Sequence, residues 1–221
     1  MKEINTKNAI DFFVFSCMGL KPNINDFNEL ARHAVLRAYR DAASRVLSVK
    51  DEYKDKKKQE GTKLIVEFIS SLDDKKISDY DNAHRDLCNK IMEIYAVNGT
   101  YLYAGSGIYE NDNRKMTIGI AQKWINMSVK YFYLISLVND KSSLFSSSFH
   151  DYIKDFHVPL DSIMLDRIDK KLKINKKDFG IESWSKADNY DAYLKYQNTI
   201  KDKIPKEYQS ALDWECDTWL E

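Results

Sequence analysis

The chain has 221 residues, of which 43% are hydrophobic, and its 34 lysines and arginines are balanced by 34 aspartates and glutamates. This length allows one large or two small packing units with a sizeable core. The formal net charge of zero disfavours a protein that holds DNA through bulk positive charge, so any nucleic-acid contact needs local groups of cations. Two such groups lie within residues 54–58 and 170–177, and a solvated helix end is the alternative interpretation of the second.

The cysteines and the apolar run near the N-terminus indicate a cytoplasmic protein, and the histidines bear on whether a metal site is present. Cys17, Cys88 and Cys216 are odd in number and far apart, which is typical of a reducing compartment. The apolar run at residues 12–20 is too short to span a membrane and lacks the pattern of a signal peptide. The histidines have no metal-ligand spacing and His84 is expected at the surface, so we predict no metal site.

Few helix-breaking residues interrupt the chain. Seven glycines and three prolines predict long helices, and in the first half of the chain apolar residues recur at three- and four-residue steps. The helices expected there cover residues 6–18, 25–47, 61–72 and 79–97. The first should end at Gly19, with a turn at residues 21–23, and a lysine-rich connector should precede the third. Residues 101–107 are expected to form a connecting loop, with a ligand contact as the alternative, and residues 141–148 a surface loop.

A glycine turn followed by a helix stands at the centre of the chain. Gly119 precedes a helix expected from Ala121 to about Val138, whose apolar stripe predicts one buried face. Lys123 lies in the first turns of this helix, and Lys130 follows seven residues later on the same face. The helix therefore presents two lysines beside its buried stripe.

A proline and an aspartate introduce the next helix. Pro159 restricts the residue before it to an extended backbone, and Asp161 then stands at the N-cap position. Further helices are expected over residues 188–203 and from Pro205 towards the C-terminus, where Trp214 lies. A lysine and an aspartate are thus both presented at helix N-termini.

These two segments resemble a known enzyme family, the helix-hairpin-helix DNA glycosylases that excise 8-oxoguanine. The likeness is greatest to the archaeal-type 8-oxoguanine glycosylases, in which a Gln-Lys pair begins the helix, a second lysine follows, and a Pro-hydrophobic-Asp-Ser segment comes downstream. Here these features are Gln122-Lys123, Lys130 and residues 159–162. The likeness covers residues 116–167, and the loop between its two halves is somewhat longer than in that branch.

The resemblance implies an all-α fold, a two-lobed helical bundle with a helix-hairpin-helix core. The bundle would be one domain, with lobes roughly at residues 1–98 and 99–221. The implied partner is double-stranded DNA with a damaged or modified base, contacted by the hairpin backbone at Gly119 and Ala121, and the implied state is a monomer. No cofactor is implied, although hairpin carbonyls in this family can hold a monovalent cation.

The resemblance also assigns roles to three charged residues. After the damaged nucleotide is flipped out, the neutral amine of Lys123 attacks C1′, displaces the base and forms a Schiff base that permits strand cleavage. Asp161 stabilises the cationic sugar and helps to transfer protons. A lysine in water is protonated at pH 7, so the helix dipole and the like charge of Lys130 are expected to keep the Lys123 amine neutral. Without the resemblance, a surface lysine and an ordinary N-cap are the favoured interpretation of these residues.

Several further residues are candidates for binding the extruded base. The substrate-binding candidates are Gln122, Lys130, Pro159, Trp184, Gln197 and Trp214, with Trp219 as a further aromatic. Core packing explains the three tryptophans and Gln197 equally well.

The predicted function is that of a DNA base-excision glycosylase with AP lyase activity, which removes 8-oxoguanine or another modified base through a lysine Schiff base. One alternative is a non-catalytic helical DNA-binding or interaction module that keeps the hairpin and has lost the pocket. The other is a glycosylase for a modified base of the kind carried by phage DNA. Covalent trapping separates enzyme from module, and a panel of modified bases separates the two enzymes.

Overall fold

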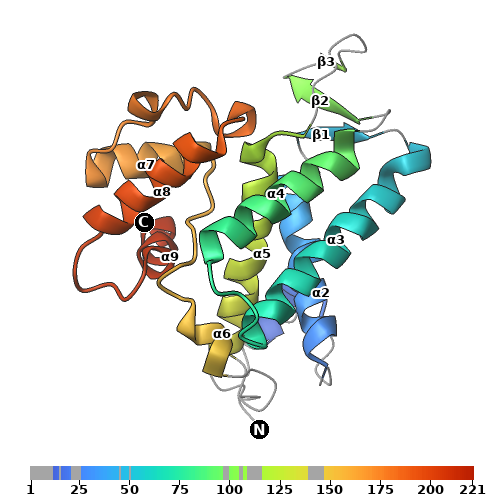
Figure 1. The fold of residues 1–221 in the computed structure, drawn as a ribbon, viewed down its shortest axis with the longest axis horizontal. Helices are drawn as coiled ribbons and strands as arrows, with labels where there is room; N and C mark the ends of the chain where they lie inside the picture. The colour runs from blue at the N-terminus through green and yellow to red at the C-terminus, as the bar shows by residue number, and fades with distance from the viewer. Residues whose placement is uncertain are drawn as a thin grey trace, which may run out of the picture.

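The computed structural model describes residues 12–14, 16–20, 26–44, 46–49, 51–96, 100–104, 107–108, 116–138 and 147–221. Over these residues the protein is predominantly helical, which confirms the all-α class (Figure 1). The helices are α2 (Phe27–Ala42), α3 (Asp51–Asp73), α4 (Tyr80–Ala96), α5 (Ile118–Val138), α6 (Ser147–Asp151), α7 (Ser162–Leu172), α8 (Tyr190–Lys203) and α9 (Ala211–Leu220), with 3₁₀ turns η2 (Lys176–Phe179) and η3 (Trp184–Lys186). A small antiparallel sheet contains β1 (Leu47–Val49), β2 (Thr100–Ala104) and β3 (Gly107–Ile108), in that order.

Side-chain caps explain where four of these helices begin. Asp26, Asp161, Asn189 and Ser210 each accept a hydrogen bond from the backbone N–H three residues later, and so begin α2, α7, α8 and α9. Gly19 ends a helical stretch with a φ of +67°, as expected from the sequence. The expected start of that stretch, the turn at residues 21–23 and residues 141–146 of the expected surface loop lie outside the described residues.

Three predicted boundaries are wrong, and each depends on distant parts of the chain. Helix α2 ends at Ala42 because the chain then enters β1, where Leu47 pairs with Leu102 of β2. Residues 101–107, expected to be a loop, include most of β2 and the start of β3. Helix α3 begins at Asp51, so the lysine-rich connector is helical. One of its lysines, Lys57, is buried and donates from Nζ to the Ile94 carbonyl of α4 at 2.9 Å.

Helix α5 is buried on almost every side rather than on one face. It packs against α2, α3 and α4. Its Trp124 is completely buried, and the indole Nε1 donates to the Val35 carbonyl at 3.0 Å. Helix α3 comes close enough at Gly61 that a Cβ there would lie 2.5 Å from the Trp124 ring, so only glycine fits. A helix that is apolar on most of its faces is buried at the centre of a bundle, as α5 is here.

The described helices form two groups (Figure 1). Helices α2 to α5 lie side by side in one bundle, and α7, α8 and α9 pack with one another in a second group. Since α5 belongs to the first bundle, the division falls after α5 rather than near residue 98. The extended segment before α7 connects the two groups and runs along α5.

Candidate active site

A cavity of about 320 Å³ lies where the two groups of helices meet. Residues of α2, α5, α7 and α9 line it, together with the segment before α7. The lining residues are Arg37, Asp41, Lys123, Met127, Lys130, Tyr131, Pro159, Asp161, Ile163, Met164, Glu215 and Trp219. Six of these twelve side chains carry a formal charge, and they form three cation–carboxylate pairs. Three ion pairs around one small cavity make this the candidate active site.

Lys123 and Asp161 form the first pair. Lys123 Nζ lies 3.3 Å from Asp161 Oδ2 and 4.5 Å from the centre of the Trp184 ring. The other carboxylate oxygen of Asp161, Oδ1, accepts the backbone N–H of Met164 at 2.8 Å and caps α7. The cap fixes the carboxylate, while Oδ2 still faces the lysine. Asp161 can therefore be both an N-cap and a candidate catalytic residue, because each role uses a different oxygen.

Lys130 and Glu215 form the second and most buried pair. Their Nζ and Oε2 atoms are 2.6 Å apart, and each side chain is only 5% exposed. Burial raises the pKa of Glu215, although the Lys130 ammonium acts in the opposite direction. Charges removed from water are costly unless they are paired, so these two side chains depend on each other.

Arg37, Asp41 and Tyr131 form the third polar group. Asp41 Oδ2 accepts the Tyr131 hydroxyl at 2.6 Å and lies 3.3 Å from Arg37 Nε. Burial, together with the Asp41 carboxylate, raises the pKa of Tyr131 above its usual value. Arg37 and Asp41 come from α2, so the first bundle supplies one wall of the cavity.

Two apolar side chains at the cavity remain open to solvent. Ile163 is 47% exposed and Trp219 is 42% exposed, and both line the cavity. The Arg167 guanidinium lies 5.0 Å from the centre of the Trp219 ring and also donates to the Thr218 carbonyl. Arg167 therefore holds the indole at the rim. Large exposed apolar groups beside a charged cavity are typical of a surface that a ligand covers.

The structure brings four of the predicted site residues together at the cavity: Lys123, Lys130, Pro159 and Asp161. Trp184 contacts Lys123 through its ring. Gln122 and Gln197 are buried away from the cavity, and Trp214 lies in the hydrophobic core.

Gly119 and Ala121 are buried as well, and Gly119 has a packing role. Its N–H donates to the Ala187 carbonyl at 2.8 Å, and a Cβ there would lie 1.6 Å from the Trp184 carbonyl oxygen. The segment around η3 therefore covers the start of α5, and a glycine is needed because the two backbones touch.

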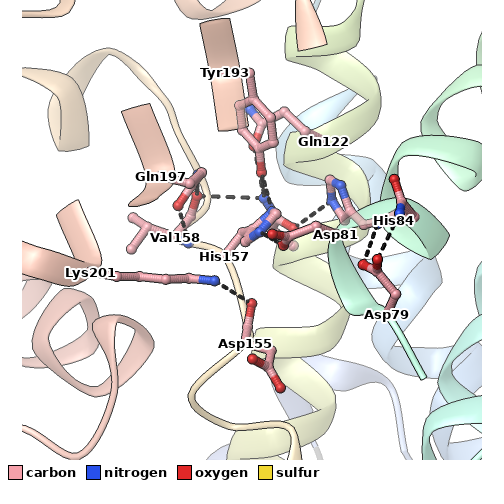
Figure 2. A network of polar contacts seen from close by, with 12 residues as sticks. Asp79, Asp81, His84, Gln122, Asp155, His157, Val158, Tyr193, Gln197 and Lys201 are labelled. Atoms are coloured by element: carbon pink, nitrogen blue, oxygen red, sulfur yellow. Dashed lines mark hydrogen bonds and ion pairs between the residues drawn. The ribbon is translucent and has the colours of Figure 1, made fainter. Parts of the chain in front are cut away.

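Gln122 and Gln197 belong to a buried polar network on another side of α5 (Figure 2). The expectation that His84 lies at the surface is wrong. His84 is completely buried and contacts Asn126 through Nε2 at 3.0 Å and Tyr190 through Nδ1 at 2.7 Å. His157 contacts Tyr193 through Nδ1 and Asp81 through Nε2, both at 2.9 Å. The sequence shows no signal for this burial, because the partners of both histidines come from distant helices.

Sequence reasoning also missed Arg37, Asp41 and Glu215. Arg37 and Asp41 are one helical turn apart, a spacing that signals a pair but not its position in the fold. Glu215 had no signal except its place between two apolar residues, Trp214 and Cys216. Its partner Lys130 lies 85 residues earlier, so only the fold reveals the pair.

Two kinds of feature are absent from the part of the chain that the structure describes. No helix there is both long and apolar enough to cross a bilayer. Within the same residues, no three His, Cys, Asp or Glu side chains are grouped so that they could hold a metal ion. Comparison with known proteins finds no matching family model, no similar curated protein and no similar solved structure.

Proposed function

We propose that the protein is a DNA base-excision glycosylase with AP lyase activity, which removes an oxidised or modified base, with 8-oxoguanine as the first candidate. The observation that carries this proposal is the contact between Lys123 Nζ and Asp161 Oδ2, at 3.3 Å, in the wall of a small cavity. The two residues are 38 positions apart and come from different elements. A nucleophile beside a proton acceptor is the arrangement that this reaction needs.

The chemistry follows from these two side chains. Asp161 Oδ2 is placed to take a proton from the Lys123 ammonium, which leaves a lone pair on Nζ. The amine attacks C1′ as the bond from C1′ to the base breaks, and the departing base receives a proton. Loss of a second proton from Nζ and opening of the sugar ring give a Schiff base. The Schiff base acidifies the C2′ hydrogen, so that β-elimination expels the 3′ phosphate and cuts the strand.

The rest of the cavity suits a flat base with polar edges. Met127, Pro159 and Met164 offer apolar surface for a ring, and Lys130 and Glu215 offer donors and an acceptor away from water. 8-Oxoguanine carries both donors and acceptors on its edges. A glycosylase for another modified purine would use the same features, so the base has to be determined by experiment.

The position of the cavity supports the finer details of the proposed fold. In a two-lobed glycosylase the base enters between the lobes, and this cavity is lined by α2 and α5 on one side and by α7 and α9 on the other. We extend the proposal to a helix-hairpin-helix core and to a monomer acting on double-stranded DNA. Exposed lysines at the end of α7 and in η2 supply local positive charge for phosphates, namely Lys170, Lys171, Lys173 and Lys177.

Borohydride trapping tests the proposal directly. The protein is incubated with duplexes that carry 8-oxoguanine or one of a panel of other modified bases, and a covalent adduct is mapped by peptide sequencing. We expect the adduct on Lys123, and Lys123→Gln should abolish adduct and strand cleavage while duplex binding persists. The matched control is Lys90→Gln, a change of an exposed lysine outside the cavity, which should still form the adduct. An adduct on Lys130 contradicts the assignment, and no adduct with any base leaves the non-catalytic module as the better interpretation.

A further inference from the structure

We infer that Gln122, Asn126 and Gln197 are positioning residues, which hold the segment carrying Asp161 in register with Lys123. The catalytic consequence rests on the proposed function, whereas the geometric claim does not. The backbone supports the two proposed catalytic side chains in different ways. Lys123 is placed by a regular helix, but Asp161 follows residues 156–160, which have no regular secondary structure. All five of these residues are nevertheless buried.

A buried, irregular segment needs partners for its backbone polar groups. Gln197 of α8 supplies both partners of Val158: its Oε1 accepts the Val158 N–H at 3.0 Å and its Nε2 donates to the Val158 carbonyl at 2.8 Å (Figure 2). The side-chain amide therefore replaces a neighbouring strand. Because Gln197 is completely buried, water does not compete for these two bonds.

Gln122 makes the link to the catalytic helix. Its Nε2 donates to the Gly119 carbonyl at 2.8 Å and to the Leu160 carbonyl at 3.3 Å. Leu160 directly precedes Asp161, and Gln122 directly precedes Lys123. One amide group thus ties together the two backbones that present the proposed nucleophile and its carboxylate.

The network allows one orientation for each of its members. Carbonyl oxygens only accept, so Gln122 must turn its nitrogen towards Gly119 and Leu160 and its Oε1 towards Asn126. Asn126 Nδ2 then donates to Gln122 Oε1 and to the Tyr193 hydroxyl oxygen, both at 2.9 Å.

The network continues from Tyr193 through His157 towards solvent. The Tyr193 hydroxyl keeps its proton for His157 Nδ1, and His157 donates from Nε2 to the partly exposed Asp81 carboxylate. His157 is itself part of the irregular segment, so its side chain anchors the end opposite Leu160. Every polar group in this chain of contacts has a partner, and such networks favour a single conformation.

Two variants and one control test the inference. Gln122→Met keeps the shape of the side chain but loses both donated bonds and the accepted one. Gln197→Met releases Val158 without altering α5, and it carries the test if Gln122→Met does not fold. The control is Ser128→Ala: Ser128 is buried on the same helix, but its hydroxyl donates only to the Trp124 carbonyl one turn earlier.

The first readout needs no DNA. It is the rate at which an amine-reactive reagent modifies Lys123 at fixed pH, measured by peptide mass spectrometry. Asp161→Asn is the reference, because it removes the carboxylate that forms the ion pair with Lys123 at 3.3 Å. We expect Asp161→Asn to speed modification about three- to tenfold, Gln122→Met and Gln197→Met to approach that rate, and Ser128→Ala to match the wild type. Wild-type rates in both folded methionine variants overturn the inference.

The second readout is the single-turnover rate of base excision. A shift of about 1 Å at a reacting group costs up to about a hundredfold in rate, so the methionine variants should excise roughly 10- to 100-fold more slowly with duplex binding unchanged. Excision equal to that of Ser128→Ala at a similar melting temperature contradicts the positioning role. If the wild type excises no base but the modification rates behave as expected, the glycosylase proposal fails and the geometric claim stands.

Discussion

Two polar regions contact α5, namely the cavity and the network around Asn126. They differ in charge and in whether they enclose an open volume. The cavity contains three cation–carboxylate pairs around an open volume of about 320 Å³. The network around Asn126 is built mainly from amides, tyrosines and histidines, and these side chains are fully or almost fully buried.

The difference shows how one helix can serve two purposes. Charges beside a cavity remain available to a ligand, whereas a network in which each group has a partner holds backbone in place. Lys123 and Gln122 are neighbours in the sequence, yet they belong to opposite regions. The following predictions test this division, beginning with the largest expected effect.

The buried pair in the cavity should be the most sensitive to the loss of one partner. Glu215→Leu leaves the Lys130 ammonium buried without its carboxylate, and we expect the free energy of unfolding to fall by about 3–5 kcal/mol. The double variant Lys130→Met with Glu215→Leu removes both charges and should recover most of that loss. Urea denaturation of the two variants measures the difference. Equal losses in the single and double variants would show that packing, and not the unpaired charge, is responsible.

Asp161→Asn should separate the capping role of Oδ1 from the proposed catalytic role of Oδ2. Asparagine caps helices as well as aspartate does, so the melting temperature should change little. If Asp161 stabilises developing positive charge, base excision should fall by about 10²–10³, by analogy with the loss of one electrostatic contact in other active sites. Parallel measurement of thermal unfolding and single-turnover excision tests this. A loss of stability without a loss of excision would leave Asp161 only as a cap.

The neutral network should make the protein sensitive to acid. Burial lowers the pKa of His157 to about 4, against the pull of Asp81, and lowers the pKa of His84 well below its usual value. Histidines in the unfolded chain titrate near about 6.5, so between about pH 6.5 and 4 the unfolded state binds more protons. Stability should therefore fall with pH across that window, by up to about 1.4 kcal/mol per pH unit for each histidine.

Urea denaturation at two pH values measures the effect of the buried histidines. The urea midpoint should drop from pH 7.5 to pH 5, and His157→Gln should reduce the drop. The hydrogen bond from His157 lowers the pKa of Asp81, whose contribution is lost only below about pH 4 and so lies outside this window. A midpoint that stays constant from pH 7.5 to pH 5 would mean that the histidines are solvated and that the network is not closed.

The sequence predicted well whatever depends on neighbouring residues. Asp161 was assigned as an N-cap from the proline before it, and its Oδ1 accepts the Met164 N–H as a cap does. The expected helix over residues 188–203 is α8, Tyr190–Lys203. These features need only contacts within about one helical turn, so the local pattern suffices.

Tertiary structure decided where charges and polar groups are buried. No local pattern separates Lys57, which is buried against α4, from Lys54 and Lys56, which are exposed. Glu215 meets Lys130 only because α9 packs close to α5, and His84 is buried only because α8 brings Tyr190 against α4. The order of lysine and aspartate along the chain was readable from the sequence. Their contact was not, because the desolvation of a side chain depends on which distant segments surround it.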